Sequence, residues 1–83
     1  MNTNNGTAQC ARLLKRLQME PIDTLTAMRE LNILRPGARI GELRDLGHEI
    51  FTHRIVLTDD QGRTHRRIAL YFLSTNPPAG VSV

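Results

Sequence analysis

Residues 33–53, ILRPGARIGELRDLGHEIFTH, contain the change of period that decides the fold. Apolar residues first recur at helical spacing, at Ile40, Leu43 and Leu46. Pro36 suits the first turn of such a helix, because its missing N–H would be unpaired there in any case, and Gly47 is a common helix stop. From His48 onward, β-branched and aromatic residues replace the helical spacing. The stretch predicts a helix over about 35–47 that leads directly into a β-strand.

The segment before this helix predicts a second, shorter one. Pro21 breaks the chain, and Asp23 or Thr24 can cap a helix of about nine residues that ends at Asn32. The expected inner positions of this helix are Leu25, Met28 and Leu31. Only two residues then separate it from the next helix, and two helices joined by so tight a turn have helix-turn-helix geometry.

An amphipathic pattern near the start of the chain predicts a further helix, with Thr7 as its N-cap. Its buried positions fall at helical spacing: Cys10, Leu13, Leu14 and Leu17. Cys10 is the only cysteine, so no disulfide can form within the chain. We interpret it as a small buried hydrophobe rather than a reactive thiol.

Two strand-like segments follow the helices. EIFTHRIVLT (49–58) and RTHRRIALYFL (63–73) flank DDQG (59–62), whose glycine can take the left-handed position of a bulged hairpin turn. The predicted fold class is therefore α+β, a three-helix bundle with a C-terminal β-hairpin. We expect the domain to span residues 7–73, between disordered tails at 1–6 and 74–83.

Both faces of the predicted hairpin carry apolar residues. If the strands pair without irregularity, one face holds Ile50, Val56, Ile68, Leu70 and Phe72. The other face then holds Phe51, Ile55, Leu57, Tyr71 and Leu73. Three short helices can cover only one face, so the other is a candidate surface for a homodimer or another protein partner.

The charge balance favours a polyanionic partner. Eleven Lys and Arg residues stand against eight Asp and Glu, giving a net charge of +3 and a pI near 10.0. Ten of the eleven cations are arginine, whose planar fork matches phosphate oxygens and base edges. No apolar stretch approaches the roughly 20 residues of a membrane span, and we expect a cytoplasmic protein without a membrane partner.

Several strings carry a resemblance to a known family. RELNILRPGARIGELRDLGHEIFT (29–52) and GRTHRRIALYFL (62–73), with the leucines of the first helix, resemble the winged helix-turn-helix domain of small phage and prophage proteins. More distantly, LRDLGHEIFT (43–52) is similar to the biotin-repressor type of DNA-binding domain. The resemblance implies a three-helix core with a β-wing, and DNA binding in which the third helix enters the major groove.

The start of the third helix carries the first group of candidate DNA-binding residues. A cation there is opposed by the helix dipole by about 0.3 to 1 kcal/mol, but a phosphate docked at that end would turn the cost into a gain. Small residues would let the backbone approach a groove, and a glutamate can accept a hydrogen bond from cytosine. The candidates are Arg35, Gly37, Ala38, Arg39 and Glu42. Alternatively, Arg39 pairs with Glu42 and only covers the core.

The hairpin carries the second group, on a wing that spans about residues 54–67. These residues are Arg54, Arg63, His65, Arg66 and Arg67. Arginines on a wing can follow the phosphate backbone or enter a minor groove. The alternative is a solvated edge strand that its charges protect from aggregation. Arg44 and Asp45, later in the third helix, are expected to be solvated or paired with the first helix.

The sequence offers little for catalysis. His48 and His53 are an odd number of positions apart on a predicted strand and so point to opposite faces, and no histidine spacing fits a metal site. There is no glycine-rich phosphate loop, and a domain of this size has little room for a substrate cleft. We therefore expect a protein that is not an enzyme, with no metal, no cofactor and no small-molecule substrate.

These observations favour a DNA-binding transcriptional regulator of a phage or prophage that recognises double-stranded DNA. The alternative is a winged helix that binds another protein and no DNA, supported by the acidic residues of the third helix and the modest net charge. RNA binding is a weaker possibility, since the chain lacks the aromatic platform on which unpaired bases stack.

Overall fold

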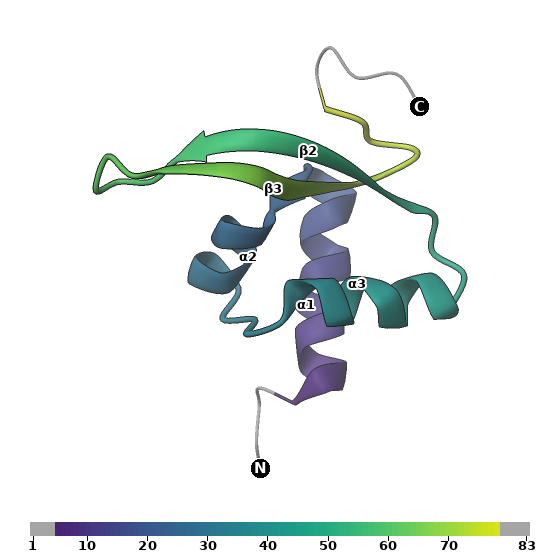
Figure 1. Ribbon diagram of the computed structural model, residues 1–83. Helices are drawn as coiled ribbons and strands as arrows, with labels where there is room; N and C mark the ends of the chain where they lie inside the picture. Colours follow the sequence, from purple (N-terminus) through teal and green to yellow (C-terminus); the bar gives the residue numbers. More distant parts are fainter. Residues whose placement is uncertain (1–4, 79–83) are drawn as a thin grey trace.

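A computed structural model describes residues 5–78 of the protein (Figure 1). Its elements, in chain order, are α1 (Gly6–Met19), β1 (Ile22–Asp23), α2 (Thr24–Glu30), α3 (Pro36–Asp45), β2 (Ile50–Thr58) and β3 (Thr64–Leu73). The three helices lie against one face of a sheet with antiparallel pairing and strand order β1-β3-β2. The predicted α+β class, with three helices and a C-terminal hairpin, is confirmed. β1 was not predicted, because two residues are too few to show a period.

The predicted N-cap is wrong for α1 and right for α2. The N-cap of α1 is Asn5 rather than Thr7, and its side-chain oxygen accepts a hydrogen bond of 2.8 Å from the backbone N–H of Ala8. Asp23 caps α2, as one of the two predicted alternatives, and accepts from the N–H of Thr26 at 2.8 Å. The seven residues of α2 are fewer than predicted.

Most of the two predicted tails lies outside the described residues. The described parts are attached to the domain. Gly6 belongs to α1, and the side-chain amide of Asn76 donates a hydrogen bond of 3.4 Å to the carbonyl of Leu17.

The core lies between the helices and the sheet. Its buried members are Leu13, Leu17, Ile22, Ala27, Ile33, Ile40, Leu43, Ile50, Ala69 and Tyr71. The predictions for α1 and α3 hold for Leu13, Leu17, Ile40 and Leu43, and half-buried Cys10 packs against the same cluster. Two predicted inner positions are wrong. Met28 is 45% exposed because α2 turns Ala27 inward instead, and Leu46 is 74% exposed because it follows the last residue of α3.

The end of α3 follows the prediction for Gly47. Its φ of 99° is left-handed, and its N–H donates to the carbonyl of Arg44 at 2.9 Å. The N–H of His48 donates to the carbonyl of Leu43 at 3.1 Å, which completes a Schellman motif. The chain then turns back into β2, which runs over α3 (Figure 1).

A β-bulge interrupts the pairing of β2 with β3. Ile55 pairs with Ile68 and Leu57 with His65, so Val56 alone lies opposite both Arg66 and Arg67. Arg67 has a φ of 58°, in the left-handed region. This extra residue shifts the register of β3 by one position, which exchanges its two faces.

The faces predicted for a regular hairpin are therefore wrong for β3. The side chains that face away from the helices are Phe51, His53, Ile55, Leu57, His65, Ile68, Leu70 and Phe72. Those on the helix side include Ile50, Thr52, Arg54, Val56, Ala69 and Tyr71. The bulge also breaks alternation between His65 and Ile68, so both intervening arginines lie on the helix side of the wing.

Candidate nucleic-acid interface

The first turn of α3 is positively charged, with no acidic residue. Arg35 is the N-cap residue, and its exposed side chain makes no capping hydrogen bond. Its carbonyl accepts from the N–H groups of Ala38 at 3.1 Å and Arg39 at 3.2 Å, which starts the helix. The N-terminal end of the helix dipole and the Arg35 guanidinium both present positive charge to solvent, as an anion site requires.

Arg39 and Glu42 are placed differently from Arg35. The Arg39 Nε atom is in ion contact with a Glu42 carboxylate oxygen, although the geometry is not that of a hydrogen bond, and the Arg39 side chain is only 22% exposed. Its guanidinium lies against α1, where a Cβ added to Gly6 would be 2.9 Å from Arg39 Nη1. This arrangement agrees with the alternative interpretation, in which Arg39 pairs with Glu42 and the two charges offset each other. A DNA contact by either would first have to break this pair.

Cys10 lies beside the same pair. Its Sγ is 3.8 Å from the carbonyl of Arg39 and 3.9 Å from a carboxylate oxygen of Glu42. Burial, followed by the negative charge of Glu42, raises the pKa of the Cys10 thiol. The thiol is therefore protonated at neutral pH, which agrees with a packing role.

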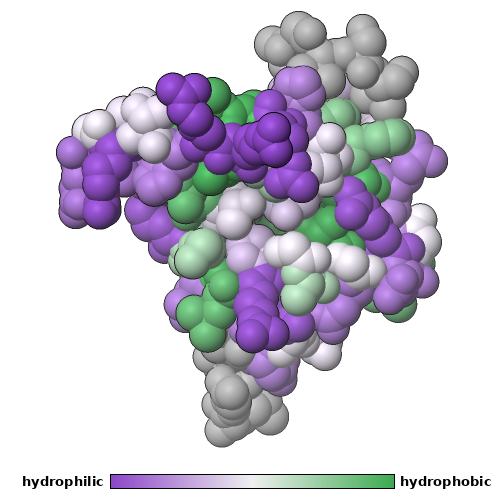
Figure 2. Space-filling view, in the orientation of Figure 1, coloured by the Kyte–Doolittle hydropathy of each residue, from purple (hydrophilic) through white to green (hydrophobic). Residues whose placement is uncertain are grey.

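The exposed side of α3 carries very small side chains. Gly37 and Ala38 are exposed, and a Cβ added at Gly41 would meet no atom within 4 Å. A Cβ added at Gly37 would lie 3.6 Å from the Tyr71 hydroxyl oxygen, so Gly37 faces the helix side of the sheet. In Figure 2 the surface over α3 is accordingly pale, below a strongly hydrophilic hairpin. This side of the helix allows another backbone to approach closely and contributes little positive charge.

Arg44 joins α3 to the wing. Its Nε donates to the carbonyl of Ile50 at 2.9 Å, and its Nη2 donates to the Thr52 hydroxyl at 2.9 Å. Arg44 is exposed, as one of the two expected alternatives has it, but the partners that it does contact lie in β2 and not in the first helix. The contact arises only because the chain after Gly47 folds back over α3, which residue spacing along a helix does not reveal. Arg44 holds α3 and the base of β2 in one relative orientation.

Three arginines gather at the bulge of the wing. Arg54, Arg66 and Arg67 line a shallow hollow of about 270 Å³ together with Ile55 and Val56. The Nη1 atom of Arg54 lies 3.5 Å from the carbonyl of Arg67, a weak contact across the hairpin. Val56 is 60% exposed among these cations. The register shift thus places the three arginines around one hollow of the wing.

The other two predicted wing residues are tied to Asp59 at the turn. The Asp59 carboxylate accepts from the N–H groups of Gln61 at 3.0 Å and Arg63 at 2.9 Å. It also lies 3.3 Å from Arg63 Nε and 2.9 Å from His65 Nε2. The hydrogen bond with His65, followed by the one from the Arg63 N–H, is the main reason why the pKa of Asp59 is lowered to about 2. Asp59 thus orders the tip of the wing and offsets the charge of Arg63.

This hydrogen bonding predicts a pH-dependent contribution to stability. The folded pKa of Asp59 is depressed from 3.8, so its contribution is fully present above pH 3.8 and is lost as the pH falls through about 2. An Asp59→Asn variant should unfold at a lower temperature than the natural chain at pH 6, and the difference should shrink between pH 4 and pH 2. Thermal unfolding across this range tests it. A difference that stays constant with pH would contradict a role for the ionised carboxylate.

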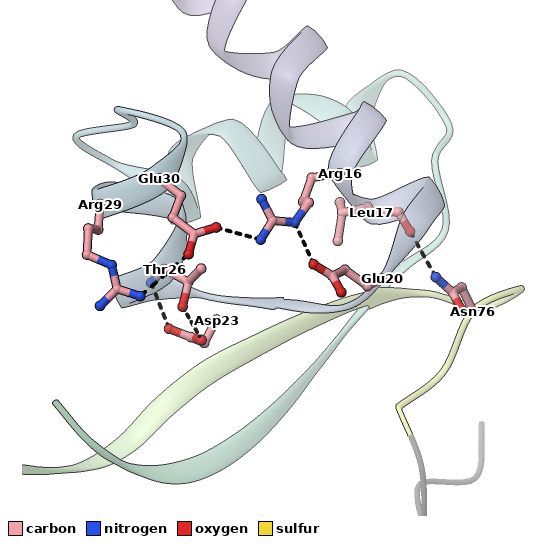
Figure 3. A network of polar contacts seen from close by, with 8 residues as sticks. All are labelled: Arg16, Leu17, Glu20, Asp23, Thr26, Arg29, Glu30 and Asn76. Atoms are coloured by element: carbon pink, nitrogen blue, oxygen red, sulfur yellow. Dashed lines mark hydrogen bonds and ion pairs between the residues drawn. The ribbon is translucent and has the colours of Figure 1, made fainter. Parts of the chain in front are cut away.

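The ion pairs divide the arginines into two groups. Within residues 5–78, the arginines that pair with a carboxylate are Arg16, Arg29, Arg39 and Arg63. Figure 3 shows the largest such network, in which Arg16 bridges Glu20 and Glu30 and Arg29 approaches Glu30. Four described arginines that form no ion pair lie at the start of α3 and on the wing: Arg35, Arg54, Arg66 and Arg67. Arg54 makes only the 3.5 Å contact with the carbonyl of Arg67. Arg12 belongs to neither group, since its Nε donates to the carbonyl of Leu31 at 3.0 Å.

A tight α2–α3 turn followed by a wing defines a helix-turn-helix protein of the winged class. The family model described as the winged helix-turn-helix domain matches residues 8–76, and the chain belongs to this family. The predicted resemblance to winged helix-turn-helix domains is thereby confirmed, and membership of the family suggests DNA binding. No curated protein and no solved structure matches the chain.

Two other features are absent from the described residues, a membrane-spanning helix and a cluster of metal ligands. No helix among residues 5–78 is long and apolar enough to cross a membrane. Within the same range, His, Cys, Asp and Glu side chains form no group of three that could hold a metal ion.

Proposed function

We propose that the protein binds double-stranded DNA through the start of α3 and the helix-side face of the wing. The observation that carries this proposal is the distribution of arginines without a carboxylate partner. Arg35 lies at the start of α3, and Arg54, Arg66 and Arg67 lie together on the wing. A guanidinium that no carboxylate neutralises is free to replace the counterions of a phosphate, and this exchange drives DNA binding.

The two surfaces have different tasks in this proposal. The small residues Gly37 and Ala38 let α3 enter the major groove closely, and Arg35 contacts a phosphate or a guanine edge at its start. Glu42 and Asp45 keep the helix itself from being strongly basic. The wing arginines therefore supply most of the electrostatic affinity, and Arg44 keeps the wing at a fixed orientation to α3.

The biological role that we infer is transcriptional regulation in the cytoplasm of a phage-infected or prophage-carrying cell. Its support is the resemblance of residues 29–52 and 62–73 to small phage domains. The fold and the arginine distribution are compatible with any task that needs a DNA contact, including excision or assembly.

A second candidate function, binding of another protein without DNA, has one specific observation in its favour. The Arg39–Glu42 pair and the small residues of α3 leave the helix that family members place in DNA with little charge of its own. This candidate predicts no salt-dependent binding to duplex DNA at all.

A salt titration with one variant pair tests the DNA proposal. We expect the logarithm of the affinity for mixed-sequence duplex to fall against the logarithm of salt by about 0.9 per phosphate contact. Arg35→Ala should weaken binding by up to about tenfold, and should reduce the slope by about 0.9 if Arg35 contacts phosphate.

Arg29→Ala is the matched control, because it removes the same charge from an exposed arginine that pairs with Glu30. It should leave the slope unchanged. If Arg35→Ala and Arg29→Ala change the binding curve equally, the start of α3 is not the interface. Natural-chain affinity that is absent, or independent of salt, would refute DNA binding itself.

A further inference from the structure

The edge of β2 that faces away from β3 is open. Within residues 5–78, β2 pairs only with β3 and lies at the end of the strand order. Near one end of β2, the carbonyl of Glu49 accepts from the N–H of Ser74 at 3.2 Å. Past its other end, the N–H of Asp59 donates to the carbonyl of Arg63 at 2.8 Å. Because backbone groups alternate in direction along a strand, the odd-numbered residues of β2 point to β3 and the even-numbered residues point outward.

Arg44 agrees with this direction and closes one end of the edge. Its Nε donates to the carbonyl of Ile50, an even-numbered residue whose backbone is not turned to β3. The open part of the edge therefore begins at Thr52. Its even-numbered residues are all exposed: Thr52, Arg54, Val56 and Thr58.

Another strand matches this edge better than the backbone of DNA does. Phosphate oxygens accept hydrogen bonds but donate none, so they could pair with the outward N–H groups of Arg54 and Val56 but not with their carbonyls. An extended peptide offers donors and acceptors in alternation and can pair with both. With nine residues, β2 is long enough for such pairing.

The helix side of the edge is cationic. Arg54, Arg66 and Arg67 line the hollow around Val56, and none of the three forms an ion pair within residues 5–78. In an added strand, the residues directly opposite Arg54 and Val56 would turn their side chains to the same face. Carboxylates at these positions would meet the guanidinium groups, and opposite charges across neighbouring strands stabilise a sheet.

The other side of the edge is mainly apolar. The side chains of β2 that point away from the helices beside the open edge are His53, Ile55 and Leu57. The residues of an added strand that alternate with its carboxylates would lie next to them. The edge therefore fits an extended segment in which acidic and apolar residues alternate.

A second copy of β2 is a poor occupant of the same edge. Antiparallel pairing of two β2 strands about their middle would bring Arg54 of one copy beside Arg54 of the other. Like charges on neighbouring strands are destabilising, and cations on an edge protect it from such pairing. The same arginine thus disfavours self-association and favours an acidic strand.

We propose that the open edge of β2 binds an extended acidic segment of another protein as an added antiparallel strand. The backbone pairs supply the affinity, and the wing arginines select for acidic residues. A segment that occupies Arg54, Arg66 and Arg67 also excludes DNA from the wing, a consequence that rests on the DNA binding proposed above. A partner protein that carries such a segment would therefore release this chain from DNA.

Hydrogen exchange without DNA tests the added strand directly. The probe is a capped synthetic peptide of about nine residues in which glutamate and valine alternate. In the free chain, the amides of Thr52, Arg54 and Val56 should exchange faster than those of His53 and Ile55, which bond to β3. At a peptide concentration about ten times its Kd, and at most about 1 mM, NMR should show exchange of the three outward amides slowed by about tenfold.

The matched control is the same peptide with N-methyl groups on its glutamates, whose N–H groups would face β2. This peptide keeps the charge and the sequence but loses the backbone donors, so it should protect none of the outward amides. Outward amides that stay unprotected at about 1 mM of the first peptide, or equal protection by both peptides, would overturn the proposal.

Competition with mixed duplex DNA tests the consequence for the wing. The unmethylated peptide at the same concentration should weaken DNA binding by about tenfold, and the methylated peptide by less than about twofold. Equal displacement by both would mean that charge alone acts. Protected amides in a chain that binds no DNA would refute the proposed function but support the added strand, whereas DNA binding without protection would do the reverse.

A pair of variants at Val56 places the peptide on this edge. Val56→Pro removes an outward N–H without changing the charge, and proline is tolerated on an edge strand where its nitrogen faces solvent. The peptide should no longer slow exchange at Thr52 and Arg54 in this variant. Val56→Thr keeps the N–H and should respond as the natural chain does. Full protection in Val56→Pro would overturn the assignment to this edge.

Discussion

An Arg54→Ala/Arg66→Ala variant should bind mixed duplex DNA about thirtyfold more weakly than the natural chain at low salt. The two residues line the same hollow of the wing, and neither forms an ion pair within residues 5–78. Each can therefore contact a phosphate without first breaking an ion pair. The loss corresponds to about 2 kcal/mol for two charge-assisted contacts. The slope of log affinity against log salt should become shallower by about 1.8.

The matched control for this variant is Lys15→Ala/Arg29→Ala. It removes the same two positive charges from α1 and α2, at exposed positions away from the wing. Long-range attraction alone would weaken both double variants alike, whereas phosphate contacts change the salt slope only when the contacting residues are lost. Equal slopes for the two double variants, measured by fluorescence anisotropy from about 50 to 200 mM salt, would exclude the wing as the DNA-binding surface.

The distinction between paired and unpaired arginines could be predicted only in part. Arg39 and Glu42 are three positions apart on one helix, and this spacing correctly suggested their pair as an alternative. Arg63 and Asp59 are joined within the turn, a pair that the sequence analysis does not name. The contact of Arg44 with β2 depends on how the chain turns after Gly47, and no local pattern encodes it.

Most of the fold could be predicted from the sequence because the patterns that determine its helices and strands are local. The helical spacing of Leu13 and Leu17, the Asn32 and Gly47 stops, and the change of period after His48 each act over a few residues. Leu46 was placed wrongly because helix spacing does not fix where an apolar stripe ends. Met28 was placed wrongly because α2 turns Ala27 inward instead. β1 was missed because its pairing with β3 is a tertiary contact between distant residues.

The register of the hairpin was beyond local reasoning. Gly62 takes the predicted left-handed conformation in the turn, with a φ of 80°. The structure has a second irregularity further along, where Arg66 and Arg67 lie opposite Val56. A shift of one residue exchanges the faces of a strand, so the predicted grouping of Ile50 with Ile68 and Phe72 failed although both strands were located correctly. The largely apolar face that points away from the helices and the basic helix-side face of the wing both follow from that single extra residue.

Arg67→Gly should make the protein more stable and, at the same time, a poorer DNA binder. The φ of 58° at Arg67 costs a non-glycine residue about 1 to 2 kcal/mol, and glycine takes this conformation without that cost. The midpoint temperature of unfolding should therefore rise by about 4 to 8 °C for each kcal/mol of stability gained in a domain of this size. The lost guanidinium should weaken DNA binding by up to about tenfold, with a salt slope shallower by about 0.9.

A gain in stability together with a loss of DNA affinity is the result expected for a strained functional residue. The surrounding structure keeps Arg67 in a costly conformation, and its guanidinium contributes only when DNA is bound. Arg67→Ala is the informative companion variant. It keeps the backbone strain and loses the guanidinium, so it should match Arg67→Gly in affinity but show no gain in stability. If Arg67→Gly instead destabilises the chain, the left-handed residue is not under strain, and if it binds DNA as tightly as the natural chain, Arg67 contacts no phosphate.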